Sequence, residues 1–164
     1  MFCVVFCVVL GWALGCVVSS FELGFVLGLL YGNVLEYLIH DFIFHRLGRK
    51  KGSIWSYHLK DHHVLSRKNN FIDLTESKVE SIGMLGLVLV HMPIIYLSFG
   101  FWLGVTSYAM AFKYLHGFQH SHPEFTKKYM KWHWEHHMKD SNKNFGVVMP
   151  LSDYLFRTRK KYKN

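Results

Sequence analysis

The feature that most constrains this chain is the placement of its basic residues. No Lys or Arg precedes Arg46, and none lies between Lys78 and Lys113. All 19 fall within three blocks, residues 46–78, 113–143 and 157–163. Apolar residues fill the intervals, so that 164 residues combine 51% hydrophobic composition with a formal net charge of +8. This layout is typical of an integral membrane protein with a polar, basic cap.

Four apolar runs are long enough to cross a bilayer, which takes roughly 20 residues with about 17 as the lower limit. They are residues 2–18, 23–39, 82–98 and 101–115. Ser19 and Ser20 supply the first turn, and Ser98 to Gly100 the second. Pro93 is expected to kink the third helix. The predicted fold is all-α: one domain over residues 1–164, with two transmembrane hairpins and a helical cap at 40–81 and 116–164.

The charges also predict an orientation. Glu22 is the only charge near the hairpin turns, and every Lys and Arg lies on the opposite side. The positive-inside rule then places both termini and the cap in the cytoplasm, at the endoplasmic reticulum in a eukaryote or the inner membrane in a bacterium. The basic blocks flank membrane spans without any nucleic-acid-binding motif, so no nucleic-acid partner is expected.

The first apolar run holds all three cysteines, Cys3, Cys7 and Cys16. An odd number confined to one helix does not form a disulfide framework, so these are interpreted as small packing residues, with S-acylation of Cys3 as the alternative. The run has no basic segment before it, and a second apolar run follows closely. We therefore expect it to stay in the mature protein rather than to be a cleaved signal peptide.

Twelve histidines are the chemical signature of the sequence. Ten of them form four clusters: His40 and His45; His58, His62 and His63; His116 and His120; and His133, His136 and His137. Residues three or four apart share a helix face, so the last three clusters each have members that converge: His58 with His62, His116 with His120, and His133 with His136 and His137. His45 and His63 are expected to point elsewhere, by about 140° from His40 and His58 on a 3.6-residue helix.

Ten imidazoles are too many for one tetrahedral site, but two ions with about five ligands each use them all. Neutral imidazole binds iron, zinc, copper and nickel, and a metal relieves the repulsion that protonation of ten neighbours would cause. The other two histidines stand apart. His122 precedes Pro123 and is expected in a loop, whereas His91 lies near mid-membrane, either as a hydrogen-bonded packing residue or as a substrate contact.

The composition of the clusters narrows the chemistry. No cysteine lies near them, which excludes iron–sulfur and zinc-finger sites, and the chain lacks a nucleophile elbow and a phosphate-binding loop. Two ions at a lipid interface suit oxidation of a lipid by O₂, which zinc does not support because it has no redox chemistry. Metal transport, non-catalytic metal binding and a scaffold role are the competing classes.

The clusters resemble the histidine boxes of the fatty acid hydroxylase superfamily, whose members are membrane oxygenases with a dimetal centre. EYLIHDFIFH (36–45), HLKDHH (58–63), YLHGFQH (114–120) and HWEHHMKDSNKNFGVVMPLSDYLFRT (133–158) are similar to the four boxes of the sphingolipid fatty acid 2-hydroxylases. The resemblance covers residues 30–160.

The resemblance implies residue roles. The implied metal ligands are His40, His45, His58, His62, His63, His116, His120, His133, His136 and His137. Asp153 matches the acid of the family's tail and would orient a ligand imidazole through its free N–H, and Glu36 is a candidate for the same role because it lies one turn before His40. For Glu36, a carboxylate neutralised by Lys or Arg is the alternative. Asn144 and Gly146 are expected to shape a turn. The implied cofactors are two iron ions, which zinc can replace in isolated protein, and O₂ is the co-substrate.

Several departures leave the substrate open. The second box has three residues where the family usually has two, and Asp41 stands where relatives often carry Arg. The sequence shows no cytochrome b5 domain, so we expect an external donor such as cytochrome b5, or ferredoxin with its reductase, to supply electrons. The predicted activity is hydroxylation of a fatty acyl or sphingolipid chain by a non-haem di-iron monooxygenase. Carotenoid or sterol hydroxylases and desaturases of the same superfamily are the alternative, and a non-catalytic metal-binding membrane protein is the second.

Overall fold

The computed structural model describes residues 5, 8–13 and 20–163, and within them every regular element is a helix. The elements are α2 (Phe21–Leu38), the π-helices η1 (Ile39–Leu47) and η2 (His58–His62), α3 (His63–Lys68), α4 (Lys78–His91), the 3₁₀-helix η3 (Met92–Tyr96), α5 (Phe99–Ser121), α6 (Pro123–Tyr129), α7 (Lys131–Met138) and α8 (Leu151–Leu155). The expected all-α fold is confirmed for this part of the chain.

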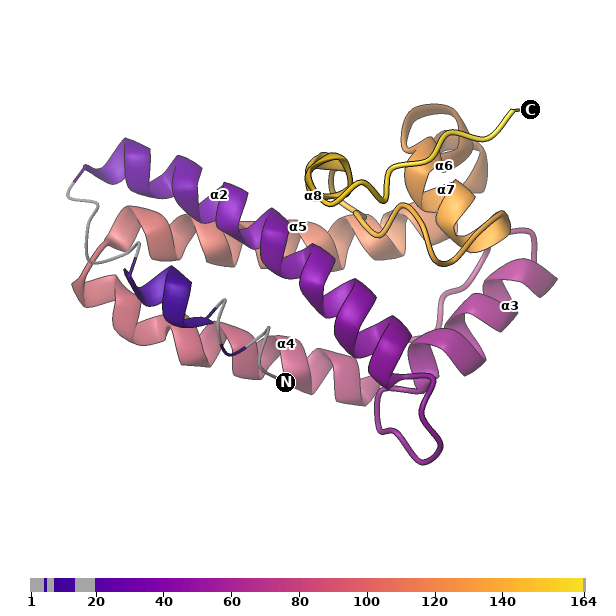
Figure 1. Cartoon of the computed structure of the whole chain (residues 1–164), viewed down its shortest axis with the longest axis horizontal. Coiled ribbons are helices and arrows are strands. Elements are labelled where there is room, and N and C mark those ends of the chain that lie inside the picture. Colours follow the sequence, from indigo (N-terminus) through magenta and orange to yellow (C-terminus); the bar gives the residue numbers. More distant parts are fainter. Residues whose placement is uncertain (1–4, 6–7, 14–19, 164) are drawn as a thin grey trace.

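The long helices and the short ones occupy different parts of the molecule. Helices α2, α4 and α5 run along its long axis, and α3, α6 and α7 gather toward one end (Figure 1). The core between the long helices consists of Tyr31, Leu35, Ile94, Phe101 and Val105. The arrangement is that of a helical bundle carrying a cap of short helices.

Close packing of α2 against α5 depends on glycine. A Cβ atom added at Gly28 would lie 2.3 Å from the carbonyl oxygen of Phe101, and one added at Gly104 would lie 2.3 Å from that of Phe25. Both distances are shorter than any real Cβ contact, so the two backbones approach each other where side chains are absent. Small residues four apart are a common interface between membrane helices.

Helix α4 ends where the sequence predicts a break. Its last α-helical residue is His91, and Pro93 lies in the 3₁₀-helix η3 that follows. The chain then turns at Ser98, whose hydroxyl accepts the backbone N–H of Phe101 and begins α5. Phe99 and Gly100 belong to α5 rather than to the turn, so the turn is shorter than expected.

Two helical segments are long and apolar enough to cross a membrane, Phe21–Leu47 and Lys78–Tyr96. The first contains the span expected at 23–39, and the second contains all but the last two residues of the span expected at 82–98. The second segment has an exposed apolar surface, since Ile82 is 69% and Leu85 59% exposed. The span expected at 101–115 lies within α5, which is long enough but is not among the two. The span expected at 2–18 falls largely outside the described residues.

The carboxyl-terminal tail folds back onto the cap. Arg159 forms an ion pair of 3.2 Å with the buried carboxylate of Glu135 on α7, and it donates a hydrogen bond to Asn144. The backbone N–H of Lys160 also donates to Asn144, at 2.7 Å. These contacts fix the loop between α7 and α8 over the histidines.

Candidate metal centre

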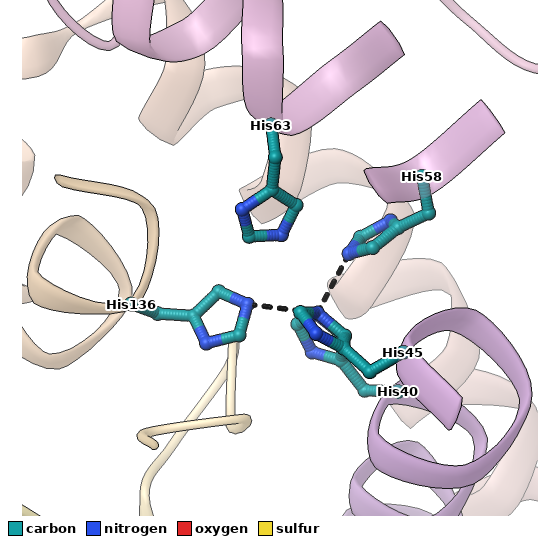
Figure 2. A group of neighbouring side chains, drawn as sticks. All are labelled: His40, His45, His58, His63 and His136. Atoms are coloured by element: carbon teal, nitrogen blue, oxygen red, sulfur yellow. Dashed lines mark hydrogen bonds between the residues drawn. The ribbon is translucent and has the colours of Figure 1, made fainter. Parts of the chain in front are cut away.

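Nine of the ten clustered histidines form two compact groups. The first contains His40, His45, His58, His63 and His136, and the second contains His62, His116, His120 and His137. Within each group one nitrogen from every ring lies within 4.8 Å of the others. His133 adjoins the second group, because its Nε2 lies 3.0 Å from Nε2 of His137. Figure 2 shows the rings of the first group pointing toward a shared centre.

Two π-helices position four of the five members of the first group, and α7 supplies the fifth, His136. His40 and His45 lie in η1. His58 is the first residue of η2, and His63 directly follows η2. In a π-helix the hydrogen bonds run from residue i to i+5, so residues five apart lie above one another. The expectation that His45 and His63 point away from His40 and His58 is therefore wrong, since it assumed α-helical geometry.

Histidines of the same sequence cluster do not always belong to the same group. His58 and His62, expected to converge, lie with ring centroids 5.2 Å apart but in different groups. On α7, the adjacent His136 and His137 likewise belong to opposite groups, and only His133 stays with His137. The η2 and α7 segments thus each serve both groups, so the two sites share their walls.

Five of the ten clustered rings are oriented through Nδ1 by a hydrogen-bond acceptor. Backbone carbonyls accept in three cases: Phe145 from His40 at 2.5 Å, Phe71 from His120 at 2.8 Å and Lys143 from His136 at 2.7 Å. An acceptor at Nδ1 places the proton there and leaves a lone pair on Nε2, the arrangement common to metal-ligating histidines.

Two of the acceptors are side chains that the sequence analysis did not identify. Asp73 accepts from Nδ1 of His62 at 2.7 Å, and Gln119 accepts from Nδ1 of His133 at 2.5 Å. Gln119 lies inside the third histidine cluster, beside His120, which was a usable signal. Asp73 is 11 residues from His62 in a loop, and no spacing rule connects the two.

The carboxylate of Asp73 is held ionised. Burial alone would raise its pKa, but the hydrogen bonds from His62 and Thr75 outweigh that effect and lower the pKa to about 2. Both oxygens are used, one by His62 and the other by the backbone N–H and hydroxyl of Thr75. The result is a fixed anion next to a ring of the second group.

The ring nitrogens that face the centres fit metal ions. His62, His116 and His120 each have a buried Nε2 without a hydrogen-bond partner, and neither nitrogen of His63 has one. Nε2 of His40 lies 2.9 Å from Nε2 of His58, and Nε2 of His136 lies 3.1 Å from that of His45. Spacings of about 3 Å suit nitrogens that share an ion at bond lengths of about 2.0–2.1 Å.

Burial keeps these rings neutral. It lowers the pKa of His133, His136 and His137 well below the usual value, and neighbouring imidazoles lower it further. The pKa of His120 falls to about 3 for the same reasons, burial first and then His62. Neutral imidazole is the form that binds metals, so the buried groups could bind metal ions at neutral pH.

The two carboxylates expected to orient ligand rings make other contacts. Asp153 accepts the backbone N–H groups of Phe145 and Gly146, each at 2.8 Å, and so fixes the turn whose Phe145 carbonyl orients His40. Glu36 accepts the hydroxyl of Tyr108 and the N–H of Val147. Both act on the loop between α7 and α8 rather than on an imidazole, and neither described contact of Glu36 is with Lys or Arg.

The remaining singled-out residues lie outside the two groups. His91 is fully buried, with Nε2 3.0 Å from the Tyr31 hydroxyl and Nδ1 2.7 Å from the Leu87 carbonyl, which gives it a packing role. His122 is exposed at the end of α5. Asp41 pairs with Arg46 at 2.6 Å instead of reaching the rings.

A cavity of about 570 Å³ adjoins the histidines. It lies between α2, α4 and α5, and His40, His58, His62, His116 and His120 form part of its wall. Much of the remaining wall is apolar and includes Leu35, Ile39, Leu87, Val90, Val105 and Phe112. Its volume is in the range of pockets that hold small organic ligands.

The family model for fatty acid hydroxylase matches residues 25–158, which is most of the chain. The chain belongs to the fatty acid hydroxylase family. The resemblance expected from the histidine boxes is thereby confirmed at the level of the family, whose name indicates a hydroxylase. Searches of curated proteins and of solved structures found no match.

Family membership and geometry support each other. The matched region contains all ten clustered histidines, the cavity and the loop that orients His40. The cavity places an apolar wall beside histidines from both buried groups.

Proposed function

We propose that this protein is an O₂-dependent membrane lipid hydroxylase that inserts a hydroxyl into a C–H bond of a fatty acyl or sphingolipid chain at a non-haem di-iron centre. The observation that carries the proposal is the apolar cavity whose wall includes histidines from both buried groups. One oxygen atom of O₂ enters the C–H bond, and the other leaves as water with two electrons and two protons from outside the chain.

The donor set favours iron. All-imidazole groups with no thiolate suit several first-row metals, but oxidation of an unactivated C–H bond requires a redox-active one, which excludes zinc as the working metal. Two bound iron ions would supply O₂ activation; the protein supplies position and exclusion of water. His40, His45, His58, His63 and His136 would hold one ion, and His62, His116, His120, His133 and His137 the other.

The protein's own groups have defined tasks in this scheme. The Nδ1 acceptors, such as Asp73 and Gln119, keep the ligand rings aimed at the centres. The apolar walls of the cavity bind the chain and hold one carbon near the histidines, which contributes through proximity. Exclusion of water from this space protects the oxidant from side reactions.

A membrane location follows from the same layout. We place four spans at 2–18, 23–39, 82–98 and 101–115, with both termini and the histidine cap in the cytoplasm. The two apolar helices and the asymmetry of Lys and Arg support this topology. The lipid would then enter the cavity from the bilayer, and an external donor such as cytochrome b5, or ferredoxin with its reductase, would dock on the cytoplasmic cap.

The test is lipidomics on cells that express wild type, His137→Ala or His122→Ala. Wild type and His122→Ala should produce a lipid heavier by one oxygen atom, and His137→Ala should not. Metal analysis of the purified proteins should find iron in the first two and less in the third. A product with two hydrogens fewer would indicate desaturation, and a carotenoid or sterol product the related hydroxylases. Bound metal without any product would overturn the proposal in favour of a non-catalytic metal-binding protein.

A further inference from the structure

Glu80 occupies an unusual position at the start of α4. Ser77 begins the helix, and its hydroxyl accepts the backbone N–H of Glu80 at 3.2 Å. In a complete capping box the glutamate at this position would accept the backbone N–H of the serine in return. Here the Glu80 side chain makes no such bond and is turned toward the cavity, whose wall it helps to form.

One oxygen of this carboxylate is buried without a hydrogen-bond partner. Glu80 Oε1 is enclosed, and its nearest basic atom is Nδ1 of His58 at 3.8 Å. That distance exceeds a hydrogen bond. A buried acceptor without a partner destabilises the protein, and more so when it is charged. The oxygen is therefore available to a donor that enters the cavity.

The surroundings offer no cation that is free to take this place. Lys113, the basic residue on this wall, already pairs with Glu76 at 2.9 Å and donates to Ser81 at 3.3 Å. Asp73 adds a further carboxylate nearby on the cavity wall. Three carboxylates against one ammonium group give this part of the wall an excess of negative charge.

We infer that Glu80 accepts a hydrogen bond from a hydroxyl or amide N–H on the polar end of the lipid that occupies the cavity. The apolar wall formed by Leu87, Val90 and Phe112 holds the chain. The site would thus select uncharged lipids with a donor at the polar end, and it would disfavour a free carboxylate or phosphate because of the neighbouring negative charge. The inference rests on the proposed function only in that a lipid fills the cavity.

The test measures binding, so it does not depend on turnover. The probes are dibromo-octadecanol, dibromo-octadecanamide, the methyl ether of the alcohol and dibromo-octadecanoate, added to the detergent-solubilised, metal-loaded full chain. Bromine quenches tryptophan fluorescence on contact, and Trp55 lies in the cavity wall. The signal of interest is the quenching that Trp55→Phe removes.

At a pH of about 9, where the Glu80 carboxyl is ionised, wild type should bind the alcohol, the amide or both about 10-fold or more tightly than the ether, as expected for one hydrogen bond to a charged acceptor. Glu80→Met should remove that preference by weakening the donor-bearing probes, while the ether binds as before. The matched control is Glu76→Met, which changes an exposed and already paired carboxylate on the same wall and should keep the preference. Unchanged metal content would show that the variants fold.

A second variant covers the case in which Glu80→Met does not fold. Glu80→Gln keeps the size of the side chain and a weaker carbonyl acceptor, but it removes the charge. The preference for the alcohol over the ether should therefore shrink to a few-fold. Dibromo-octadecanoate should bind several-fold more tightly than it does to wild type. Equal binding of donor probes and ether by wild type would overturn the inference, as would a preference that survives in Glu80→Met. Loss of hydroxylation with every lipid, with the preference intact, would instead count against the proposed function alone.

Discussion

Replacing Asp73 with Asn should weaken one of the two metal sites and leave the other intact. The carboxylate uses one oxygen for Nδ1 of His62 and the other for the N–H and hydroxyl of Thr75. Asparagine has the same shape but a single acceptor oxygen, so either His62 or Thr75 loses its acceptor and faces an N–H₂ group instead. His62 belongs to the second histidine group, and no member of the first group contacts Asp73.

The size of the effect follows from these contacts. Loss of a partner that orients a metal-ligating histidine typically lowers metal affinity about 10–100-fold. In addition, a buried polar group left without a partner destabilises the fold by about 1–3 kcal/mol. The metal affinity of the first group should be unchanged, because its two rings that have an Nδ1 acceptor, His40 and His136, use the backbone carbonyls of Phe145 and Lys143 and not Asp73.

The assay is a titration of the purified, metal-loaded protein with a chelator, followed by metal analysis. At a chelator concentration that leaves wild type with both ions, Asp73→Asn should retain only one. The matched control is Asp61→Asn, which removes an exposed carboxylate next to His62 and should behave as wild type. Full retention of both ions by Asp73→Asn would refute the assignment of Asp73 as a positioning residue for the second group.

Three further outcomes are expected. Gly28→Val should lower the thermal unfolding temperature by the equivalent of about 1–3 kcal/mol, because the valine side chain would meet the Phe101 carbonyl. Gly86→Ala should be neutral, because Gly86 has open space around it. His122→Ala should leave the metal content of the protein unchanged, since this exposed ring stacks on Phe118 and its Nδ1 contacts only the Ser121 hydroxyl and the Phe118 carbonyl; a loss of metal would contradict its exclusion from the site. The metal-free protein should lose stability as the pH falls below about 6.5. The imidazoles of the unfolded chain take up protons there, whereas buried rings such as His120, whose pKa is lowered, do not. A midpoint of unfolding that stays constant through this range would argue against neutral buried rings.

The sequence predicts the helical class, the break at Pro93 and the set of clustered histidines, because these depend on composition and local spacing. It does not predict which histidines belong to which of the two groups. The rule that residues four apart converge places His58 with His62, but in the structure His58 joins His63. That outcome requires a π-helix, and π-helical hydrogen bonding leaves no recognisable pattern in the residues of 58–62.

Contacts between distant segments are the other part that sequence reasoning misses. Asp153 was expected to act on an imidazole, but it holds the N–H groups of Phe145 and Gly146 in place. Glu36 meets Val147, a residue more than a hundred positions away. The Glu36 contact forms only once the loop between α7 and α8 has folded onto α2, and no local spacing encodes that event.

The use of backbone carbonyls to orient His40, His120 and His136 has a consequence for how this centre tolerates change. A carbonyl cannot be removed by substitution, so the aim of these rings is encoded in the path of the loops and not in any one side chain. Phe71, whose carbonyl orients His120, has a φ of 79°, a left-handed conformation that costs energy for a bulky residue. The loops around residues 71 and 145 should therefore accept many changes of side chain but few changes of length, since an inserted residue would turn the carbonyls, and with them the ligands, away from the metals.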